Sequence, residues 1–528
     1  MNLSLWFEKN SPREVQFTQF TRKDFENIKS LGADVIRLPI RLHKLTTDIR
    51  NGVTNTDPDY TIDPLILEFL DSAVDWAEEL GLYIILDNHS FDPAVPTEEN
   101  IEEILLKVWG QMAEHFKDRS RFVMYEILNE PHGISEQKWG EVQGRIVEAI
   151  RKIDPVHTII VGAADFNSLK KIFTIPRYDD QNLIYTFHFY EPMVFTHQGA
   201  NWGEPHLTAL KGIPFPMESR RMPETPEELK GTWVEWDLNK YEERSSLETL
   251  DRLLDIAANF SRSRNVPVFC GEFGVFMMTS READRVRWYR TVRRMLEQKN
   301  IAWTSWDYFD GFGLFKTREG GDFPSDLNTG VVKALGFKVP PKQKEDTGPV
   351  TSGFAIYDDY TAPGIDSGFW KENGSVDFYY PENTGDGRFA IQWGNCTRYG
   401  AAWFEFRKAQ DLSRLAEEGY ALEFMARADA DAVFEVRFIN PDSLGTDIPW
   451  RVRYIIDSSI LPPDGQWHKI RIPLNMMQDS GAWSSLRESW YDPAGYFSWE
   501  KVKRLEFSAE EKDLIGTYVC IDAIHITK

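Results

Sequence analysis

The amino-acid sequence predicts an α/β protein, a (β/α)8 TIM barrel, followed by an all-β jelly-roll sandwich domain. Up to about residue 338, short apolar segments alternate with longer amphipathic ones, and beyond a polar, proline-rich stretch the apolar residues recur at every second position. Alternating strand and helix patterns are typical of parallel α/β folds, whereas a period of two is typical of antiparallel sheets. We therefore place the barrel at residues 1–338, a linker at 339–350 and the sandwich at 351–528.

Eight short segments of the first domain are apolar on both faces, as strands are when helices cover one side and a barrel interior the other. The expected strands are residues 3–7, 35–39, 83–87, 122–128, 158–162, 183–187, 266–271 and 302–306. Helical patterns lie between them, and residues 191–245 form a connection long enough to suggest a functional segment. A doubly wound open sheet is the alternative, but no glycine-rich phosphate turn follows the first strand.

Composition and charge narrow the functional classes. The 528-residue chain carries a formal net charge of −23, which disfavours nucleic acid as a partner and suits a neutral sugar chain. It has no apolar run long enough for a membrane span, and its three cysteines form neither a zinc-ligand pattern nor a disulfide framework. We expect a monomer without metal or other cofactor. Because the chain opens on a strand-like segment, we also expect an export signal to be missing and the protein to be secreted, periplasmic or at the cell surface.

Polar and aromatic side chains gather at the carboxyl ends of the expected strands, where barrel enzymes carry their active sites. Glu130 and Glu272 follow the fourth and seventh strands, which lie on opposite sides of the barrel mouth. Two facing carboxyl groups are what glycoside hydrolysis requires, whether the second attacks the anomeric carbon or activates water. A single glutamate at a strand end is more often a surface residue. Arg37 lies within a buried strand and needs a carboxylate partner, which a catalytic glutamate would supply.

The motifs at these strand ends resemble those of glycoside hydrolase family 5 in order and spacing. They are Leu128-Asn129-Glu130-Pro131, Gly271-Glu272-Phe273-Gly274, Asp87-Asn88-His89, Phe187-His188-Phe189-Tyr190, and residues 35–41 and 303–307. The resemblance covers residues 1 to about 338 and implies a retaining mechanism, with Glu130 as acid/base and Glu272 as nucleophile. The chain departs from the pattern at Ser90, where many relatives carry a second histidine, and in an abbreviated first strand.

The resemblance further implies a set of substrate-binding residues. They are Arg37, His89, Asn129, His188, Tyr190, Trp306, His197 and Trp202. Arg37 would keep Glu272 ionised, Asn129 would bind the sugar 2-hydroxyl, and Trp306 would form the floor of the −1 subsite. His197 and Trp202 belong to a loop that resembles one found in endoglucanases of the family.

These features favour a cellulose-type β-1,4-glucan as substrate. A β-1,4-mannan or glucomannan is the second choice, xyloglucan is a further one, and another barrel-hydrolase family acting on xylan is disfavoured by the motifs. A catalytically inactive polysaccharide-binding protein is an alternative of a different class, but it would be expected to have lost one of the carboxylates or their supporting residues.

The second domain resembles the jelly-roll carbohydrate-binding modules that accompany such catalysts. Trp393, Tyr399 and Trp403 are candidates for a sugar-stacking platform, although core packing is the more common role of any one of them. A sandwich that only braces the barrel is the alternative. Calcium occurs in such sandwiches, but the sequence contains no convincing ligand cluster.

Overall fold

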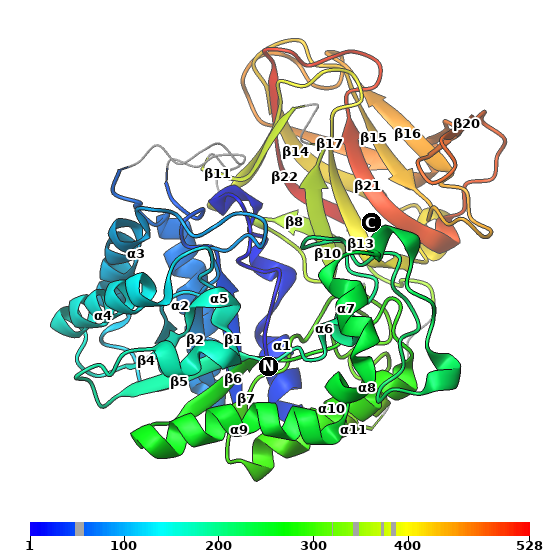
Figure 1. The fold of residues 1–528 in the computed structure, drawn as a ribbon. Helices are drawn as coiled ribbons and strands as arrows, with labels where there is room; N and C mark the ends of the chain where they lie inside the picture. The colour runs from blue at the N-terminus through cyan, green and yellow to red at the C-terminus, as the bar shows by residue number, and fades with distance from the viewer. Residues whose placement is uncertain (48–57, 319, 342–347, 371–373, 382–386) are drawn as a thin grey trace. The chain divides into compact units, whose positions relative to one another are not determined.

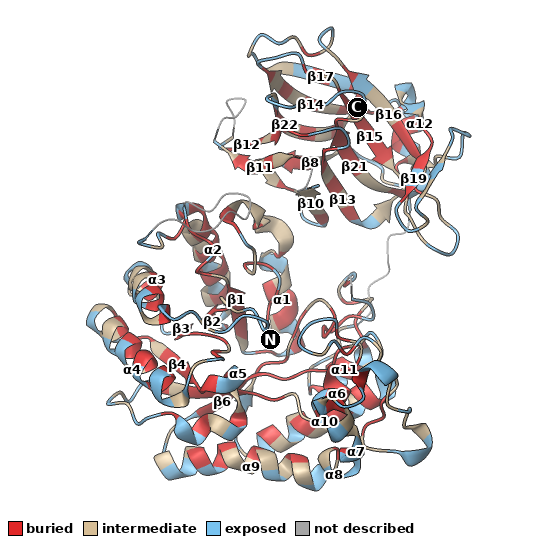
Figure 2. Cartoon of the chain, turned by 45° about the horizontal axis from the view of Figure 1, so that its top comes forward, coloured by how far each residue is buried: buried red, intermediate tan, exposed pale blue. Residues whose placement is uncertain are grey.

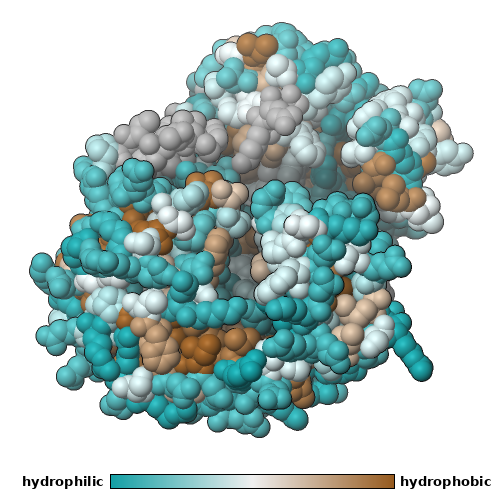
Figure 3. All heavy atoms as spheres, in the orientation of Figure 1, coloured by the Kyte–Doolittle hydropathy of each residue, from teal (hydrophilic) through white to brown (hydrophobic). Residues whose placement is uncertain are grey.

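The computed structural model describes residues 1–47, 58–318, 320–341, 348–370, 374–381 and 387–528. The chain divides into two compact units, each with its own core (Figures 1 and 2). The first unit contains Met1–Pro12 and Arg22–Gln343, and the second contains Arg13–Thr21 and Lys344–Lys528. Within the described residues, no helix is long and apolar enough to cross a membrane, and the face shown in Figure 3 is largely hydrophilic.

The first unit is a (β/α)8 barrel, as the sequence predicts. Its sheet runs in the order β1-β2-β3-β4-β5-β6-β7, with all neighbouring strands parallel. The strands are β1 (Val35–Ile40), β2 (Tyr83–Asn88), β3 (Val123–Glu126), β4 (Thr158–Gly162), β5 (Leu183–His188), β6 (Val268–Glu272) and β7 (Ala302–Trp303). The helices are α1 (Arg22–Leu31), α2 (Pro64–Leu80), α3 (Ile101–Phe116), α4 (Glu136–Ile153), α5 (Ala164–Asn167), α6 (Met193–Thr196), α7 (Trp233–Asn239), α8 (Tyr241–Arg244), α9 (Leu247–Arg264), α10 (Glu282–Gln298) and α11 (Thr329–Ala334).

The amino-terminal segment occupies the eighth strand position without forming a regular strand. Asn2 and Phe7 make isolated parallel bridges to Arg37 and Ile40 of β1. On the other side, the amide of Asn2 donates to the carbonyl of Ser305 over 3.0 Å. This segment therefore closes the sheet between β1 and the chain that follows β7, so the fourth and seventh expected strands are β3 and β6.

Buried side chains of the barrel strands form an apolar cluster and a polar zone. The apolar cluster consists of Ile85, Ile160 and Phe269, against which Val35, Met124 and Ile184 pack. The polar zone consists of Arg37, Asp87 and Glu126, which are all buried and in contact with one another through Arg37. Since buried charges are stable only when paired, the polar zone requires a fixed hydrogen-bond network.

The second unit is an antiparallel sandwich of two main sheets, as predicted. One has the order β10-β13-β21-β15-β16-β18, and the other has the order β11-β12-β22-β14-β17 with β8 and β9 attached. The elements are β8 (Phe354–Asp358), β9 (Tyr360–Thr361), β10 (Ile365–Phe369), β11 (Ser375–Tyr380), β12 (Ala390–Gly394), β13 (Ala401–Gln410), α12 (Ser413–Glu417), β14 (Ala421–Ala428), β15 (Phe434–Ile439), β16 (Arg451–Ile456), β17 (His468–Pro473), β18 (Gln478–Asp479), β19 (Ala482–Ser484), β20 (Ser489–Tyr491), β21 (Val502–Ser508) and β22 (Tyr518–Thr527).

Residues 13–21, which the sequence analysis assigned to the barrel, pack within the second unit. The side chain of Gln16 donates to the carbonyl of Ile365 over 2.7 Å and accepts from the amide of Ser367 over 2.9 Å. The hydroxyl of Tyr379 donates to the carbonyl of Val15 over 2.5 Å and accepts from the amide of Phe17. The chain therefore contributes to the second unit twice. Part of the linker expected at 339–350 lies outside the described residues.

Candidate active site

Arg37 of β1 is the centre of the polar zone of the barrel. Its side chain is fully buried, and two of its nitrogens donate to both carboxylate oxygens of Glu126, over 2.7 and 2.8 Å. The guanidinium also donates to Glu272 and to the side-chain oxygen of Asn129, each over 2.8 Å, and lies 3.0 Å from Asp87. A planar guanidinium with five donors suits such a cluster, and each contact fixes one strand end relative to β1.

Glu272, the last residue of β6, is held at both carboxylate oxygens. Arg37 donates to Oε1, and the hydroxyl of Tyr190 donates to Oε2 over 2.8 Å. The side chain is only 6% exposed. A guanidinium cation and a hydroxyl, each donating to one oxygen, favour a carboxylate acceptor, so Glu272 is the candidate for the nucleophile.

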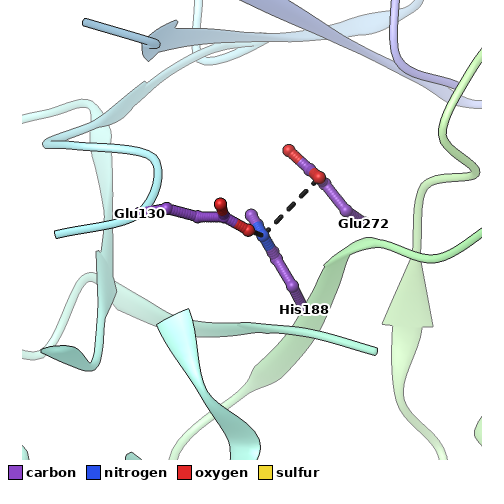
Figure 4. A group of neighbouring side chains, drawn as sticks. All are labelled: Glu130, His188 and Glu272. Atoms are coloured by element: carbon purple, nitrogen blue, oxygen red, sulfur yellow. Dashed lines mark hydrogen bonds and ion pairs between the residues drawn. The ribbon is translucent and has the colours of Figure 1, made fainter. Parts of the chain in front are cut away.

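Glu130 has a different environment. Its oxygen Oε1 lies 2.5 Å from Nδ1 of His188, the last residue of β5, and Figure 4 shows this imidazole beside both glutamates. Burial raises the pKa of Glu130 to about 7, and burial lowers the pKa of His188 to about 4. His188 is therefore neutral near pH 7, while Glu130 retains a proton that it can donate.

The two glutamates are close enough for covalent glycoside chemistry. One carboxylate oxygen of Glu130, one of Glu272 and a ring nitrogen of His188 all lie within 4.8 Å of one another. Carboxyl groups about 5–5.5 Å apart are typical of retaining glycosidases, whereas inverting enzymes need about 6.5–9.5 Å. The same three groups have the spacing of metal ligands, but a cation would have to compete with Arg37 and Tyr190 for the oxygens of Glu272.

His89 and Trp306 form the wall of the site next to β2. Nδ1 of His89 lies 2.7 Å from Asp87, and Nε2 lies 3.6 Å from Glu8. Burial opposes the charge, but these two carboxylates raise the pKa of His89 to about 9. The imidazolium is stacked on the indole of Trp306, with 5.5 Å between centroids and 13° between planes. This stacking fixes the tilt of the aromatic surface.

His197 and Trp202 lie near the nucleophile candidate. The ring of His197 packs edge-on against Tyr190 at 4.9 Å and against Phe312 at 5.6 Å, while Trp202 packs against Phe276 at 4.9 Å. Burial lowers the pKa of His197 to about 4, so it is a neutral packing partner. Trp202 is 36% exposed and supplies an open aromatic edge. The structure therefore brings all the first-domain candidates of the sequence analysis to one end of the barrel.

Some residues of this site were not identified from the sequence. Glu126 lies in a segment that the sequence analysis described only as an apolar strand. A carboxylate between apolar neighbours needs a buried cation, which points to Arg37. A second group consists of the stacked rings of His132 and Phe166, 4.3 Å apart, with Phe91 edge-on to both. Phe166 has a left-handed backbone with φ 61°, which no sequence pattern signals in a non-glycine residue.

The three candidates in the second unit have different surroundings. Trp393 is 1% exposed, and its ring packs edge-on against Phe434, so neither face is open to a sugar. Tyr399 is 57% exposed. Trp403 of β13 lies opposite Gly368 of β10, and its buried Nε1 has no hydrogen-bond partner among the described residues. Trp393 is thus a core residue, whereas the other two lie at the surface or near it.

Paired carboxyl groups at the carboxyl end of a (β/α)8 barrel define the class of barrel glycoside hydrolases. The model of the cellulase family, glycosyl hydrolase family 5, matches residues 7–311. The chain belongs to this family.

Relatives and solved structures agree with this membership. Endoglucanase 3 of Fibrobacter succinogenes is 26% identical over 351 residues, which are 64% of this chain and 52% of that protein. Endoglucanase C of Acetivibrio thermocellus is 26% identical over 319 residues, which are 58% of this chain and 90% of that protein. The crystal structure of endoglucanase Cel5A from Thermotoga maritima has a TM-score of 0.51 and 25% identity, over 63% of this chain and 95% of that one. The chain thus spans about half the length of Endoglucanase 3, and 26% of Endoglucanase H of Acetivibrio thermocellus.

Replacing Gly271 of β6 by alanine tests whether the ends of β5 and β6 must lie as close together as they do. A Cβ at this position would lie 2.9 Å from the hydroxyl of Thr186 and 3.2 Å from Nε2 of His188. We expect Gly271→Ala to displace His188 from Glu130, lower turnover by about tenfold or more and destabilise the fold by about 1–3 kcal/mol. Steady-state kinetics and thermal unfolding measure both effects.

Gly110 of α3 is the matched control, since a Cβ there would meet nothing within 4 Å. We expect Gly110→Ala to leave turnover unchanged and to stabilise the helix by up to about 1 kcal/mol. Unchanged turnover in Gly271→Ala would contradict the close approach.

Proposed function

We propose that this chain is a retaining endo-β-1,4-glucanase, with Glu130 as acid/base and Glu272 as nucleophile. The observation that carries the proposal is that two carboxyl groups, whose oxygens lie within 4.8 Å of each other, have different surroundings. Arg37 and Tyr190 hold Glu272 as an anion, and burial keeps Glu130 protonated to about pH 7. An acid and an anion at this separation are the two groups that double displacement uses.

The reaction would follow from these protonation states. In the first step Glu272 attacks the anomeric carbon, the glycosidic bond breaks, and the proton of Glu130 moves to the leaving oxygen. The ester that forms removes the negative charge of Glu272, which lowers the pKa of the nearby Glu130. In the second step the Glu130 carboxylate takes a proton from water, whose oxygen attacks the anomeric carbon and releases Glu272.

Neutral β-1,4-glucan is the substrate that the site favours. Trp306 offers an aromatic plane to a pyranose face, and Asn129 lies beside Glu130, where a 2-hydroxyl would bind. The relatives named above carry the name endoglucanase, which supports endo action on cellulose-type chains. β-Mannan is the second candidate, because one contact to the 2-hydroxyl separates the two sugars. Since polymeric glucan is extracellular, we propose that the protein acts outside the cytoplasm.

For the second unit we propose glycan binding through Trp370 and Trp403. Their rings lie 6.2 Å apart, and the guanidinium of Arg504 lies over both, at 5.8 and 5.4 Å. Trp370 is 46% exposed. Gly368 leaves room for the Trp403 indole, since a Cβ there would lie 2.4 Å from it. Tyr399 is exposed as well, with the guanidinium of Arg398 over its ring.

The pH dependence of hydrolysis tests the role of Glu130. Its raised pKa means that the acid form is present below about pH 7 and is lost above it. We expect kcat/KM on cellohexaose to fall as pH rises through about 7. An aryl cellobioside with a good leaving group needs no proton from Glu130 in the first step, so its kcat/KM should not fall over this pH range. The same alkaline limb with both substrates would contradict the assignment.

Removal of each glutamate tests the division of roles. We expect Glu272→Ala to fold and lose nearly all hydrolysis of swollen cellulose, and Glu130→Ala to lose about 10²–10⁴-fold in turnover of cellohexaose. With an aryl cellobioside, whose leaving group departs without a proton, azide should restore activity to both variants, giving a β-glycosyl azide with Glu130→Ala and an α-glycosyl azide with Glu272→Ala.

The rates at which the wild-type enzyme hydrolyses swollen cellulose and galactomannan, measured side by side, decide between glucan and mannan as the substrate. The matched control for the two glutamate variants is Glu136→Ala, which removes a nearby acidic residue from the surface. Wild-type rates in Glu272→Ala would overturn the assignment of the nucleophile, and binding without hydrolysis by the wild type would favour the binding-protein alternative.

Affinity electrophoresis in gels containing soluble β-glucan tests the second unit. We expect Trp403→Ala to reduce retardation by the glucan, because a stacked aromatic ring is lost, and to leave turnover of cellohexaose unchanged. The control is Trp483→Ala, which removes a tryptophan that is 52% exposed on β19. Equal retardation of wild type and Trp403→Ala would favour a second unit that only supports the fold.

A further inference from the structure

A short hairpin in the second unit presents two tryptophans on one face. Its strands, β19 and β20, form a separate two-stranded sheet in which Trp483 lies opposite Trp490. Because side chains alternate across a strand, the fully buried Ala482 and Ser484 point into the unit, and the two tryptophans point outward. They are 52% and 46% exposed. Figure 1 shows the hairpin at the edge of the second unit, where its outward face is accessible.

The ring of Trp490 is held in place by a buried cation. The guanidinium of Arg451 lies over the indole, 4.6 Å from its centroid. Arg451 is 5% exposed and donates to Glu510 over 3.0 Å, so its own position is fixed. A cation over an aromatic face attracts the ring, and it leaves the opposite face for a ligand.

The backbone of the hairpin is fixed as well. Arg487, in the turn between the strands, donates to Asp442 over 3.1 Å, and the hydroxyl of Ser484 donates to the same carboxylate over 2.9 Å. At the base, Gly481 has φ 76°, and a Cβ there would lie 2.3 Å from the carbonyl of Tyr491. A surface that is ordered before binding loses little conformational entropy when a ligand arrives.

The shape of the hairpin favours a flat ligand. A two-stranded ribbon at the edge of a domain has no walls to enclose a single sugar chain, but it can lie against a surface. The rings of Trp370 and Trp403, in contrast, are inclined by 48° to each other and cannot both lie on one plane. Solid β-1,4-glucan exposes flat layers of pyranose C–H groups, which stack on indole rings.

Charge selects among the possible occupants of this face. The chain has a formal net charge of −23, and Glu488 and Asp492 flank Trp490 in the sequence. A second copy of the chain, a nucleic acid or an anionic membrane would therefore be repelled. A neutral polysaccharide carries no charge and avoids this cost.

We propose that the β19–β20 hairpin is a second glycan-binding surface, which adsorbs the protein to the flat face of insoluble β-1,4-glucan. The proposal rests on the function proposed above for the choice of glucan as the ligand. It differs from the Trp370–Trp403 surface in the form of the ligand, because the hairpin binds the solid and the other surface binds a soluble chain.

Adsorption of the full chain to microcrystalline cellulose tests the proposal. We expect Trp483→Ala and Trp490→Ala each to lower the partition coefficient about fivefold or more, and Trp403→Ala to change it by less than about twofold. Retardation in gels containing soluble β-glucan should show the reverse order. The matched control is Trp236→Ala in α7, which removes a tryptophan that is 52% exposed and lies under Lys240 and Arg244, and which should leave adsorption unchanged.

Equal adsorption of the wild type and both hairpin variants would overturn the proposal. A dimer in sedimentation velocity that Trp490→Ala dissociates would also overturn it, by assigning the hairpin to a second copy. Binding to phosphatidylcholine vesicles that Trp490→Ala abolishes would assign the hairpin to a membrane instead. Failure of the wild type to hydrolyse cellohexaose, with adsorption intact, would contradict the proposed function and leave the hairpin surface in place.

Discussion

The structure of the barrel depends on one buried cation. Arg37 is fully buried, and a guanidinium in such a place is stable only when carboxylates and amides occupy its five donors. Asp87, Glu126 and Glu272 supply the negative charge from three other strands. Because these carboxylates come from β2, β3 and β6, their contacts with Arg37 fix the strand ends relative to one another. The position of the nucleophile candidate is thus a consequence of neutralising Arg37, and catalysis gains a preorganised anion from a requirement of folding.

The carboxyl groups around Arg37 outnumber this single cation, which explains why Glu130 and Glu272 have different surroundings. Burial raises the pKa of Glu126 as well as that of Glu130, so the cluster binds protons near neutral pH. Arg37 donates to Glu272 but not to Glu130, whose nearest polar neighbour is the neutral His188. The proton therefore belongs on Glu130, the group without a charged hydrogen-bond donor. The opposite roles proposed for two identical side chains thus rest on the fact that one of them shares the buried cation.

Local patterns predicted those parts of the molecule that depend on local chemistry. Continuous apolar segments located the barrel strands, and the motif around Glu272 is explained by its glycines: a Cβ on Gly274 would lie 2.3 Å from the carbonyl of Trp306. Contacts between distant segments had no such signal. Residues 13–21 join the second unit through Gln16 and Tyr379, which no period or motif connects. Trp393 was a candidate for a stacking platform with core packing as its more common role, and because β12 is buried on both faces, alternation could not reveal its side.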